Sequence, residues 1–365
     1  MTKVTVALLL VLSSSLGAAE PKRATKVSID RDKFLINGQP TYQGRMWKGK
    51  SVEGLLFNSR MVQAIFDDRN PDTRDRWAYP DTKKWDPDRN TREFLEQMPT
   101  WRKHGLLAVT LNLQGGSPEG YSKAQPWHNS AVNADGSLDE KYLARLAKVL
   151  DKADELGMVV ILGIYYFGQA QRVKDEAAVV AGVDATVDCL VEKGYTNVLI
   201  EINNECDVKA YSHDILNANR VYELIERVRK RSADKKHRLL VGTSYSGNTV
   251  PKPAVVKASD FLLLHGNGVN EPDRIGEMVH ETRKVDGYRP MPILFNEDDH
   301  FDFDKPANNF TAAVGEFASW GYFDYRMKCE GFDEGYQSVP VNWKTRSERK
   351  KGFFRLLSDI TGERP

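Results

Sequence analysis

The sequence predicts an α/β protein built as a (β/α)8 barrel with a short N-terminal β-hairpin. Apolar segments typical of buried parallel strands alternate with amphipathic helical patterns from residue 41 to the end of the chain. No proline- and serine-rich linker or low-complexity stretch interrupts this alternation. The glycine-rich turn that usually follows an early strand of a doubly wound open sheet is absent. Repeated strand–helix alternation without that turn favours a closed barrel.

The individual elements can be placed along the chain. The hairpin is predicted over Val27–Pro40, where apolar residues flank the turn signal Asn37-Gly38. Helical periodicity in residues 143–153, 180–191 and 221–228 places helices between strands, and a last helix is predicted near residues 347–360. The eight predicted barrel strands are Tyr42–Trp47, Leu106–Leu113, Val159–Tyr166, Val198–Asn203, Leu239–Tyr245, Phe261–His265, Ile293–Asn296 and Gly321–Tyr325.

The first residues are typical of an exported protein. Lys3 is the only charge within residues 1–19, Val4 to Leu12 is apolar apart from Thr5, and small residues follow. This pattern predicts a signal peptide over residues 1–19 and one barrel domain over residues 20–365, secreted or periplasmic after processing. A retained N-terminal anchor is the alternative. The apolar run is short for a membrane span and no later segment approaches one, so we expect no span in the mature chain.

Charge and cysteine content exclude several classes of protein. The 52 basic and 51 acidic residues are interspersed and give a net charge of +1, so a nucleic-acid partner is not expected. The spacing of Cys189, Cys206 and Cys329 matches no zinc motif, and an exported chain could form at most one disulfide from them. The sequence does not determine the oligomeric state.

Two predicted strands end in carboxylates. The segment VLIEINNE ends in Asn203, Asn204 and Glu205, and the segment ILFNE ends in Glu297. Polar side chains at the carboxyl end of a barrel strand indicate a functional site. We expect the two glutamates to face each other across the barrel mouth. Glycoside cleavage requires such a pair, because one carboxyl group protonates the leaving oxygen and the other attacks the sugar or activates water.

These motifs resemble clan A of the glycoside hydrolases. The strand-four segment is especially similar to the cellulase-like family 5, and FLINGQP resembles the N-terminal hairpin of the clan. The resemblance implies a retaining O-glycosyl hydrolase that acts on oligo- or polysaccharides without a cofactor. It also implies that Glu205 is the general acid/base and Glu297 the nucleophile. Asn204 would bind the 2-hydroxyl of the sugar, and His265 would contact the region of the nucleophile.

The sequence departs from family 5 at four places. Cys206 stands where the family has a proline after the acid/base, and Asn267 stands where it has a tyrosine. The strand-two arginine is missing, with Asn112 and Gln114 near its place, and strand eight has no tryptophan. The resemblance therefore leaves the substrate open.

Further residues are candidates for substrate binding. Arg45 and Asn112 lie near the ends of the first two predicted strands. Tyr166 and Tyr245 end strands three and five, where they would bind sugar, fix Glu297 by a hydrogen bond or only pack. Trp127 would be a sugar platform or only the anchor of its loop.

Two long loops, residues 48–90 and 114–137, follow the first two predicted strands. Long loops at this end of a barrel are usually functional. Their aromatic residues include Trp77, Trp85 and Trp127, at least one of which we expect near the glutamates. Such loops would partly close the pocket and favour short oligosaccharides or chain ends.

Other functions remain as alternatives. A non-catalytic carbohydrate-binding barrel would not need two facing carboxylates. A metal-dependent hydrolase would need ligands at several strand ends, and none is offered by Arg45, Met46 and Trp47. The acidic run from Glu297 to Asp304 lacks the spacing of a calcium loop, so a solvated acidic loop and no metal site are expected. Glu201 is expected to point inward as a structural, hydrogen-bonded group.

Overall fold

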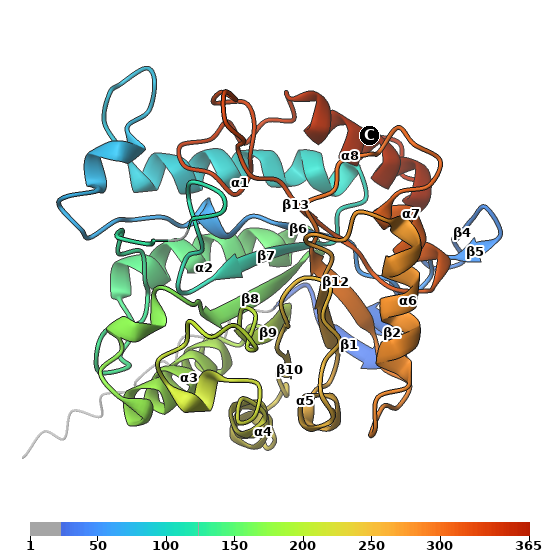
Figure 1. Cartoon of the computed structure of the whole chain (residues 1–365), viewed down its shortest axis with the longest axis horizontal. Helices are drawn as coiled ribbons and strands as arrows, with labels where there is room; N and C mark the ends of the chain where they lie inside the picture. Colours follow the sequence, from blue (N-terminus) through green and yellow to red (C-terminus); the bar gives the residue numbers. More distant parts are fainter. Residues whose placement is uncertain (1–22, 123) are drawn as a thin grey trace, which may run out of the picture.

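The computed structural model describes residues 23–122 and 124–365 (Figure 1). The predicted signal peptide, residues 1–19, lies outside the described residues and stays a prediction. Among the helices that are described, none is both long enough and apolar enough to cross a lipid bilayer.

Eight parallel strands of the described residues close into a barrel. Six of them form one sheet in the order β10-β9-β8-β7-β6-β13, and β11 pairs with β12. The bridges Ser244–Leu263 and Leu294–Ser319 join these two groups and complete the ring. The barrel strands are β6 (Asn58–Arg60), β7 (Ala108–Asn112), β8 (Val159–Tyr165), β9 (Val198–Asn203), β10 (Leu240–Gly242), β11 (Leu262–His265), β12 (Ile293–Glu297) and β13 (Gly321–Phe323).

A helix follows each barrel strand, and the helices surround the strands (Figure 1). They are α1 (Pro87–Lys103), α2 (Glu140–Glu155), α3 (Glu176–Glu192), α4 (Tyr222–Ser232), α5 (Pro253–Ala258), α6 (Pro272–Arg283), α7 (Asn309–Gly315) and α8 (Glu348–Thr361). Short 3-10 turns occur at Val62–Ala64, Arg74–Trp77, Ala170–Arg172 and Asp214–Leu216. This order confirms the predicted (β/α)8 barrel.

Polar caps fix where several helices begin. The carboxylates of Asp86, Asp139 and Asp175 accept hydrogen bonds from backbone N–H groups in the first turns of α1, α2 and α3. The Ser347 hydroxyl does the same for α8. These caps satisfy N–H groups that have no partner within the helix.

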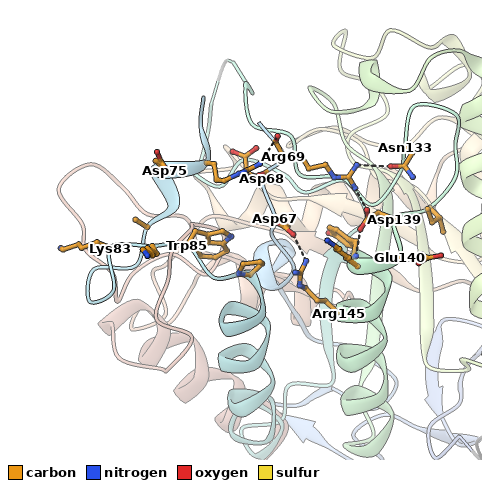
Figure 2. A pocket seen from close by; sticks show the side chains of 17 residues that line it. Asp67, Asp68, Arg69, Asp75, Lys83, Trp85, Asn133, Asp139, Glu140 and Arg145 are labelled. Carbon is orange, nitrogen blue, oxygen red and sulfur yellow. Dashed lines mark hydrogen bonds and ion pairs between the residues drawn. The ribbon is translucent and has the colours of Figure 1, made fainter. Parts of the chain in front are cut away.

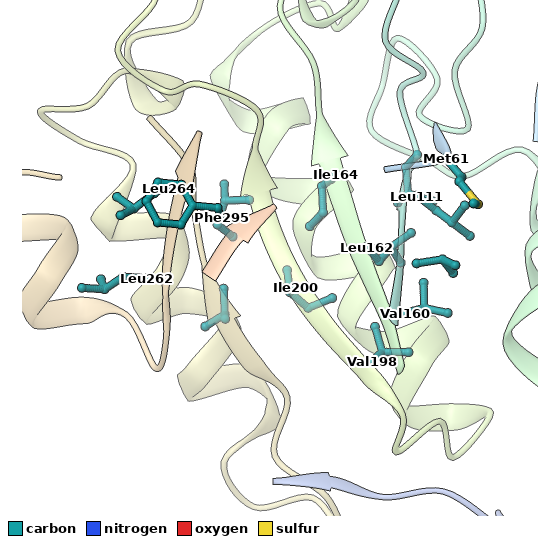
Figure 3. Packing of buried hydrophobic residues seen from close by; sticks show 14 of the residues in the cluster. Met61, Leu111, Val160, Leu162, Ile164, Val198, Ile200, Leu262, Leu264 and Phe295 are labelled. Atoms are coloured by element: carbon teal, nitrogen blue, oxygen red, sulfur yellow. The ribbon is translucent and has the colours of Figure 1, made fainter. Parts of the chain in front are cut away.

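The barrel interior changes from apolar to polar along its axis. In β9, Val198, Ile200 and Ile202 pack outward against the helices, in the cluster shown in part in Figure 3. The alternate residue Leu199 belongs to a separate apolar cluster at the amino ends of the strands. Glu201, two residues further along the same face, is fully buried. Because side chains alternate along a strand, the interior residues therefore form an apolar floor beneath a polar upper layer.

The N-terminal hairpin closes the apolar end of the barrel. It forms a small sheet of β1 (Val27–Asp30), β2 (Lys33–Ile36) and β3 (Gln39–Pro40). Val27 and Phe34 pack with the floor cluster, and the ring centroid of Phe34 lies 6.1 Å from that of Phe261. Asn37 and Gly38 both have positive φ, as the predicted turn requires.

The prediction that Tyr42–Trp47 forms the first barrel strand is wrong. Residues 46–51 form a separate hairpin of β4 (Met46–Trp47) and β5 (Lys50–Ser51), set apart from the barrel in Figure 1. The true first strand is β6, which consists of Asn58, Ser59 and Arg60. It is short and polar because Asn58 and Arg60 point into the polar upper interior, so it lacks the apolar pattern of its neighbours.

The three cysteines are free thiols in the structure. Cys206 is fully buried, Cys189 is half-buried and Cys329 is exposed. Burial raises the pKa of the Cys206 thiol, which keeps it protonated and unreactive.

Candidate active site

Glu297 ends β12 and is held by two donors. Arg60 Nε lies 2.8 Å from Glu297 Oε2. Asn267 donates a hydrogen bond of 2.7 Å from Nδ2 to Glu297 Oε1. The donors expected from the sequence were Tyr245 or His265. The structure instead uses Arg60 and Asn267, and the nearest distance between His265 Nδ1 and Glu297 is 3.8 Å.

Glu205 follows β9 and lies beside a buried histidine. His265 Nδ1 is 3.0 Å from Glu205 Oε1. The Glu205 backbone has φ of 53°, a left-handed conformation that costs a non-glycine residue about 1 kcal/mol. Its N–H donates to Ser244 Oγ at 2.9 Å. This turn at the end of the strand points the carboxylate into the mouth.

The two glutamates lie close together. A carboxylate oxygen of Glu205, one of Glu297 and a ring nitrogen of His265 all lie within 4.8 Å of one another. The structure therefore brings together the two carboxylates that the sequence places on strands four and seven. We call Arg60, Glu205, His265, Asn267 and Glu297 the catalytic mouth.

Arg60 is the central cation of this site. Its side chain is 1 % exposed, its Nη2 donates to Asn204 Oδ1 at 2.8 Å, and its Nη1 lies 3.7 Å from Glu201. Burial alone would lower the pKa of Arg60, but the carboxylates of Glu297 and Glu201 raise it, so the guanidinium stays charged.

His265 is fully buried between the two glutamates. Burial favours the neutral imidazole, but the charges of Glu297 and Glu205 act in the opposite direction. The net result is that the pKa of His265 is raised above its ordinary value.

The two predicted asparagines surround Arg60. Asn204 is buried and accepts from the guanidinium, as described above. Asn112 ends β7 and is also buried. With its amide oriented to satisfy both ends, its oxygen accepts from Arg60 Nη2 at 3.2 Å and its nitrogen donates to the Leu111 carbonyl. Gly163 leaves space for it, because a Cβ there would lie 2.2 Å from the end of the Asn112 amide. Asn112 therefore contacts the arginine beneath the site.

The predicted tyrosines occupy different positions. Tyr166 is half-buried and stacks on Phe167 with ring centroids 4.4 Å apart. Burial and the charges of Glu297 and Glu205 raise the pKa of Tyr166, so its hydroxyl is neutral beside the glutamates. Tyr245 is fully buried, and its hydroxyl lies near the Cys206 thiol. No hydrogen bond joins Tyr245 to Glu297 among the residues described.

Arg45 lies outside the site, which corrects its prediction as a substrate-binding residue. Its Nε donates to the carbonyl of Ile360 at 2.9 Å, in the last turn of α8. A helix that follows a barrel strand ends at the amino end of the barrel, so Arg45 is on the face away from the glutamates. The error follows directly from the misplaced first strand.

Trp127 is fully buried and cannot offer a ring face to a sugar. Its ring centroid lies 5.9 Å from that of Trp77, and both pack with Phe66 and Val339. Of the two roles proposed from the sequence, the structure therefore gives Trp127 that of a loop anchor. Trp85 packs beside this cluster with its ring parallel to Tyr79.

Trp85 lines a groove of about 1000 Å³ that is separate from the glutamates (Figure 2). No residue of the catalytic mouth lines it. Its wall is formed by residues 67–87 and by residues 133–145 at the start of α2. Among the lining residues, Arg145 donates to Asp67 and to the neighbouring Asp88 of α1, and Arg69 donates to Asn133.

Tyr121 is the aromatic residue of the long loops that reaches the mouth. Asn267 Nδ2 donates to Tyr121 Oη at 2.5 Å, and Tyr121 donates to Asp299 Oδ2 at 2.9 Å. The sequence placed Tyr121 in a functional loop but gave no reason to prefer it over the tryptophans. Arg60 was missed entirely, although the alternation of Asn58 and Arg60 after the apolar residues 55–57 is a usable signal.

The acidic run after Glu297 is solvated only in part: Asp302 and Asp304 are exposed, as expected, but its first residues are not. Asp298 is fully buried and accepts from Trp320 Nε1 at 2.9 Å and from Asn309 Nδ2 at 3.0 Å. Asp298 also lies 2.9 Å from His300 Nδ1. Burial raises the pKa of Asp299, which accepts from Tyr121. The predicted inward position of Glu201 is correct, and Asn296 donates to it at 3.4 Å.

Comparisons with known proteins place the fold. No protein-family model and no curated protein sequence matches the chain. Several solved structures do match it. The endo-1,4-beta-mannanase from Rhizomucor miehei has a TM-score of 0.57 at 10% identity, and the match covers 93% of this chain and 100% of that one. The GH5-4 broad specificity endoglucanase from Bacteroides salanitronis has a TM-score of 0.53 at 12% identity, covering 84% and 93%. The GH5-4 broad specificity endoglucanase from Clostridium cellulovorans has a TM-score of 0.51 at 13% identity. That match covers 84% of this chain and 94% of that one.

This chain has the barrel fold of these glycoside hydrolases. At such low identity the likeness concerns the fold alone, and the chemistry has to be argued from the side chains of the mouth.

Proposed function

We propose that this chain is a retaining glycoside hydrolase that cleaves O-glycosidic bonds of oligo- or polysaccharides. The observation that carries the proposal is the approach of a Glu205 and a Glu297 oxygen to within 4.8 Å. Carboxyl groups about 5–5.5 Å apart are typical of retaining enzymes, whereas inverting enzymes keep them about 6.5–9.5 Å apart to admit a water. The short separation favours a covalent glycosyl-enzyme intermediate.

The surroundings of the two carboxylates favour different tasks. Glu297 faces the charged Arg60 and accepts a hydrogen bond from Asn267, and these two contacts orient its carboxylate as a nucleophile requires. Glu205 is paired with His265 instead, and its side chain is 14% exposed against 7% for Glu297. A residue that exchanges protons with a leaving group and then with water needs that access.

The proposed reaction has two steps. In the first, a Glu297 oxygen attacks the anomeric carbon, the bond to the leaving oxygen breaks, and Glu205 gives its proton to that oxygen. In the second, Glu205 takes a proton from water, the water oxygen attacks the same carbon, and the ester to Glu297 breaks. Asn204 is proposed to bind the neighbouring 2-hydroxyl, with its amide oxygen held by Arg60.

Substitution of each glutamate tests these roles. Glu297→Ala should lower kcat by roughly a thousandfold or more, and added azide should not restore the natural anomer. Glu205→Ala should still cleave aryl glycosides whose leaving group needs no proton. Azide should accelerate that variant and give the β-glycosyl azide from a β-linked substrate. Wild-type turnover by Glu297→Ala would refute the nucleophile assignment.

The names of the similar structures guide the choice of substrates. Because those proteins are described as a mannanase and endoglucanases, β-linked mannans and glucans are the first polysaccharides to test. We also propose that the enzyme acts outside the cytoplasm after removal of residues 1–19. N-terminal sequencing of the exported protein would test this.

A metal-dependent hydrolase is the second candidate, because Glu205, His265 and Glu297 offer three ligand atoms close together. The guanidinium of Arg60 argues against it, since a cation 2.8 Å from Glu297 competes with a metal ion. Activity that is lost with EDTA and restored by a divalent metal would favour this candidate.

A further inference from the structure

Tyr121 combines an exposed ring with a hydrogen-bonded hydroxyl. The residue is 58% exposed. Its ring packs edge-to-face on Phe323 and Tyr325, with centroids 5.7 and 4.9 Å away. Its hydroxyl, in contrast, is bound on one side by Asn267 and on the other by Asp299. The ring therefore meets solvent at the mouth while the hydroxyl is fixed beneath it.

The hydroxyl acts on Glu297 through Asn267. An asparagine amide has two N–H groups, and Asn267 Nδ2 uses them for Tyr121 Oη at 2.5 Å and Glu297 Oε1 at 2.7 Å. The Tyr121 hydroxyl donates its one hydrogen bond to Asp299. Its oxygen must therefore accept the hydrogen bond that joins it to Asn267. This order keeps the nitrogen of Asn267, rather than its oxygen, turned toward Glu297.

The backbone before Tyr121 is built for this position. Gly120 has φ of 87°, which disfavours other residues. A Cβ at Gly120 would lie 2.8 Å from Cδ2 of Tyr325. Glycine at this position lets the chain next to Tyr121 approach Tyr325 this closely.

We propose that Tyr121 contacts the substrate with its ring and positions Asn267 on Glu297 with its hydroxyl. This inference rests on the proposed function and adds a specificity-determining residue to it. An exposed aromatic face suits a sugar that presents axial C–H bonds, as a β-linked pyranose with equatorial hydroxyl groups does. Tyr121 thus supplies the aromatic wall of a site whose nearby tryptophans are turned away or buried.

Two substitutions separate the ring from the hydroxyl. Kinetics are measured on the 4-nitrophenyl β-glycoside that the wild type hydrolyses fastest and on the matching tetrasaccharide. Tyr121→Phe keeps the ring and should lower kcat about tenfold with KM nearly unchanged, because one hydrogen bond to the nucleophile's partner is lost. Tyr121→Ala should show the same loss in kcat and, in addition, a KM raised by about tenfold on the tetrasaccharide.

A double variant tests the coupling. Asn267→Ala should also lower kcat, and adding Tyr121→Phe to it should cause no further loss, because the two groups act through one contact. Tyr325→Phe is the matched control: it removes a neighbouring hydroxyl, keeps the ring that supports Tyr121 and should leave kcat and KM unchanged. Independent, multiplicative losses would overturn the positioning role. A Tyr121→Ala protein with the KM of Tyr121→Phe would overturn the substrate contact.

A failure of the proposed function gives a result that differs from a failure of this inference. If the folded wild type hydrolyses no glycoside, the coupling is measured by urea unfolding instead. The shift in midpoint caused by Tyr121→Phe should be smaller in the Asn267→Ala background, because only the hydrogen bond to Asp299 is then left to lose. Additive shifts would show that the hydroxyl does not act on Asn267.

Discussion

The catalytic mouth and the groove beside Trp85 each contain an arginine bound by two carboxylates. In the mouth, the side chain of Arg60 is 1% exposed, and its partners Glu201 and Glu297 are 0 and 7% exposed. In the groove, Arg145 is 9% exposed, but its partners Asp67 and Asp88 are 41 and 66% exposed. The two arginines are alike, and only the burial of the carboxylates differs.

That difference in burial distinguishes the groove, where the ion pair supports the fold, from the mouth, where we propose the reaction. Water solvates the groove carboxylates whether or not Arg145 is present, so this ion pair can only add stability. The mouth carboxylates have little water, and Glu201, Glu205 and Glu297 outnumber Arg60. The charges of Glu297 and Glu205 raise the pKa of His265 against the effect of its burial. A large groove with balanced charges is thus a poorer guide to function than a crowded, unbalanced cluster.

The largest effect is expected for Arg60→Met. It leaves Glu201 and Glu297 buried without a cation, which should cost about 3–5 kcal/mol of unfolding free energy. The loss of the charge beside Glu297 should lower kcat on the order of a thousandfold. Urea unfolding and aryl glycoside kinetics measure the two effects. If Arg60→Met kept wild-type kcat, burial of the carboxylates would not distinguish the two regions.

Arg145→Met is the matched change in the groove. We expect a loss of about 1–2 kcal/mol, because Asp67 and Asp88 can turn to water. Since no mouth residue lines the groove, kcat and KM should stay within about twofold of the wild type. The same two measurements apply. A large fall in kcat would mean that the groove is coupled to the chemistry.

A smaller effect is expected from backbone strain, which both regions contain. Glu205 in the mouth has φ of 53° and Lys83 in the groove has φ of 55°. Glu205→Gly should be about 1 kcal/mol more stable than Glu205→Ala, since both lose the carboxylate and only glycine relieves the left-handed conformation. Lys83→Gly and Lys83→Ala should differ in the same direction. Thermal unfolding of the four proteins compares the strain; equal stabilities within each pair would mean that neither residue is strained.

The smallest effect expected is a dependence of stability on pH. Burial lowers the pKa of His265 and two carboxylates raise it, so only the difference between these effects remains. The pKa of His265 is raised in the folded protein, so protonation favours folding. The stability of the wild type relative to His265→Gln should be greatest below pH ~6.5, the ordinary histidine pKa. It should decrease as pH rises through the folded pKa. Urea midpoints from pH 5 to 9 would show this, and a difference that grows with pH would contradict it.

The sequence determined the barrel and its two glutamates. Strands such as Val159–Tyr165 are buried on both faces, so they are continuous apolar runs that can be recognised without their neighbours. Glu205 and Glu297 stand out because each ends such a run. Four helices, α2, α3, α4 and α8, were predicted as well, since their apolar faces are local properties of the chain.

The tertiary structure decided what surrounds the glutamates. Arg60 lies on a three-residue strand, and its buried charge is explained only by Glu201, Glu297 and Asn204, which come from distant segments. Loop packing likewise leaves Tyr121 exposed and buries Trp127. Local pattern specifies which residues form a strand or a helix, but the partners of a buried charge are fixed only when the barrel closes.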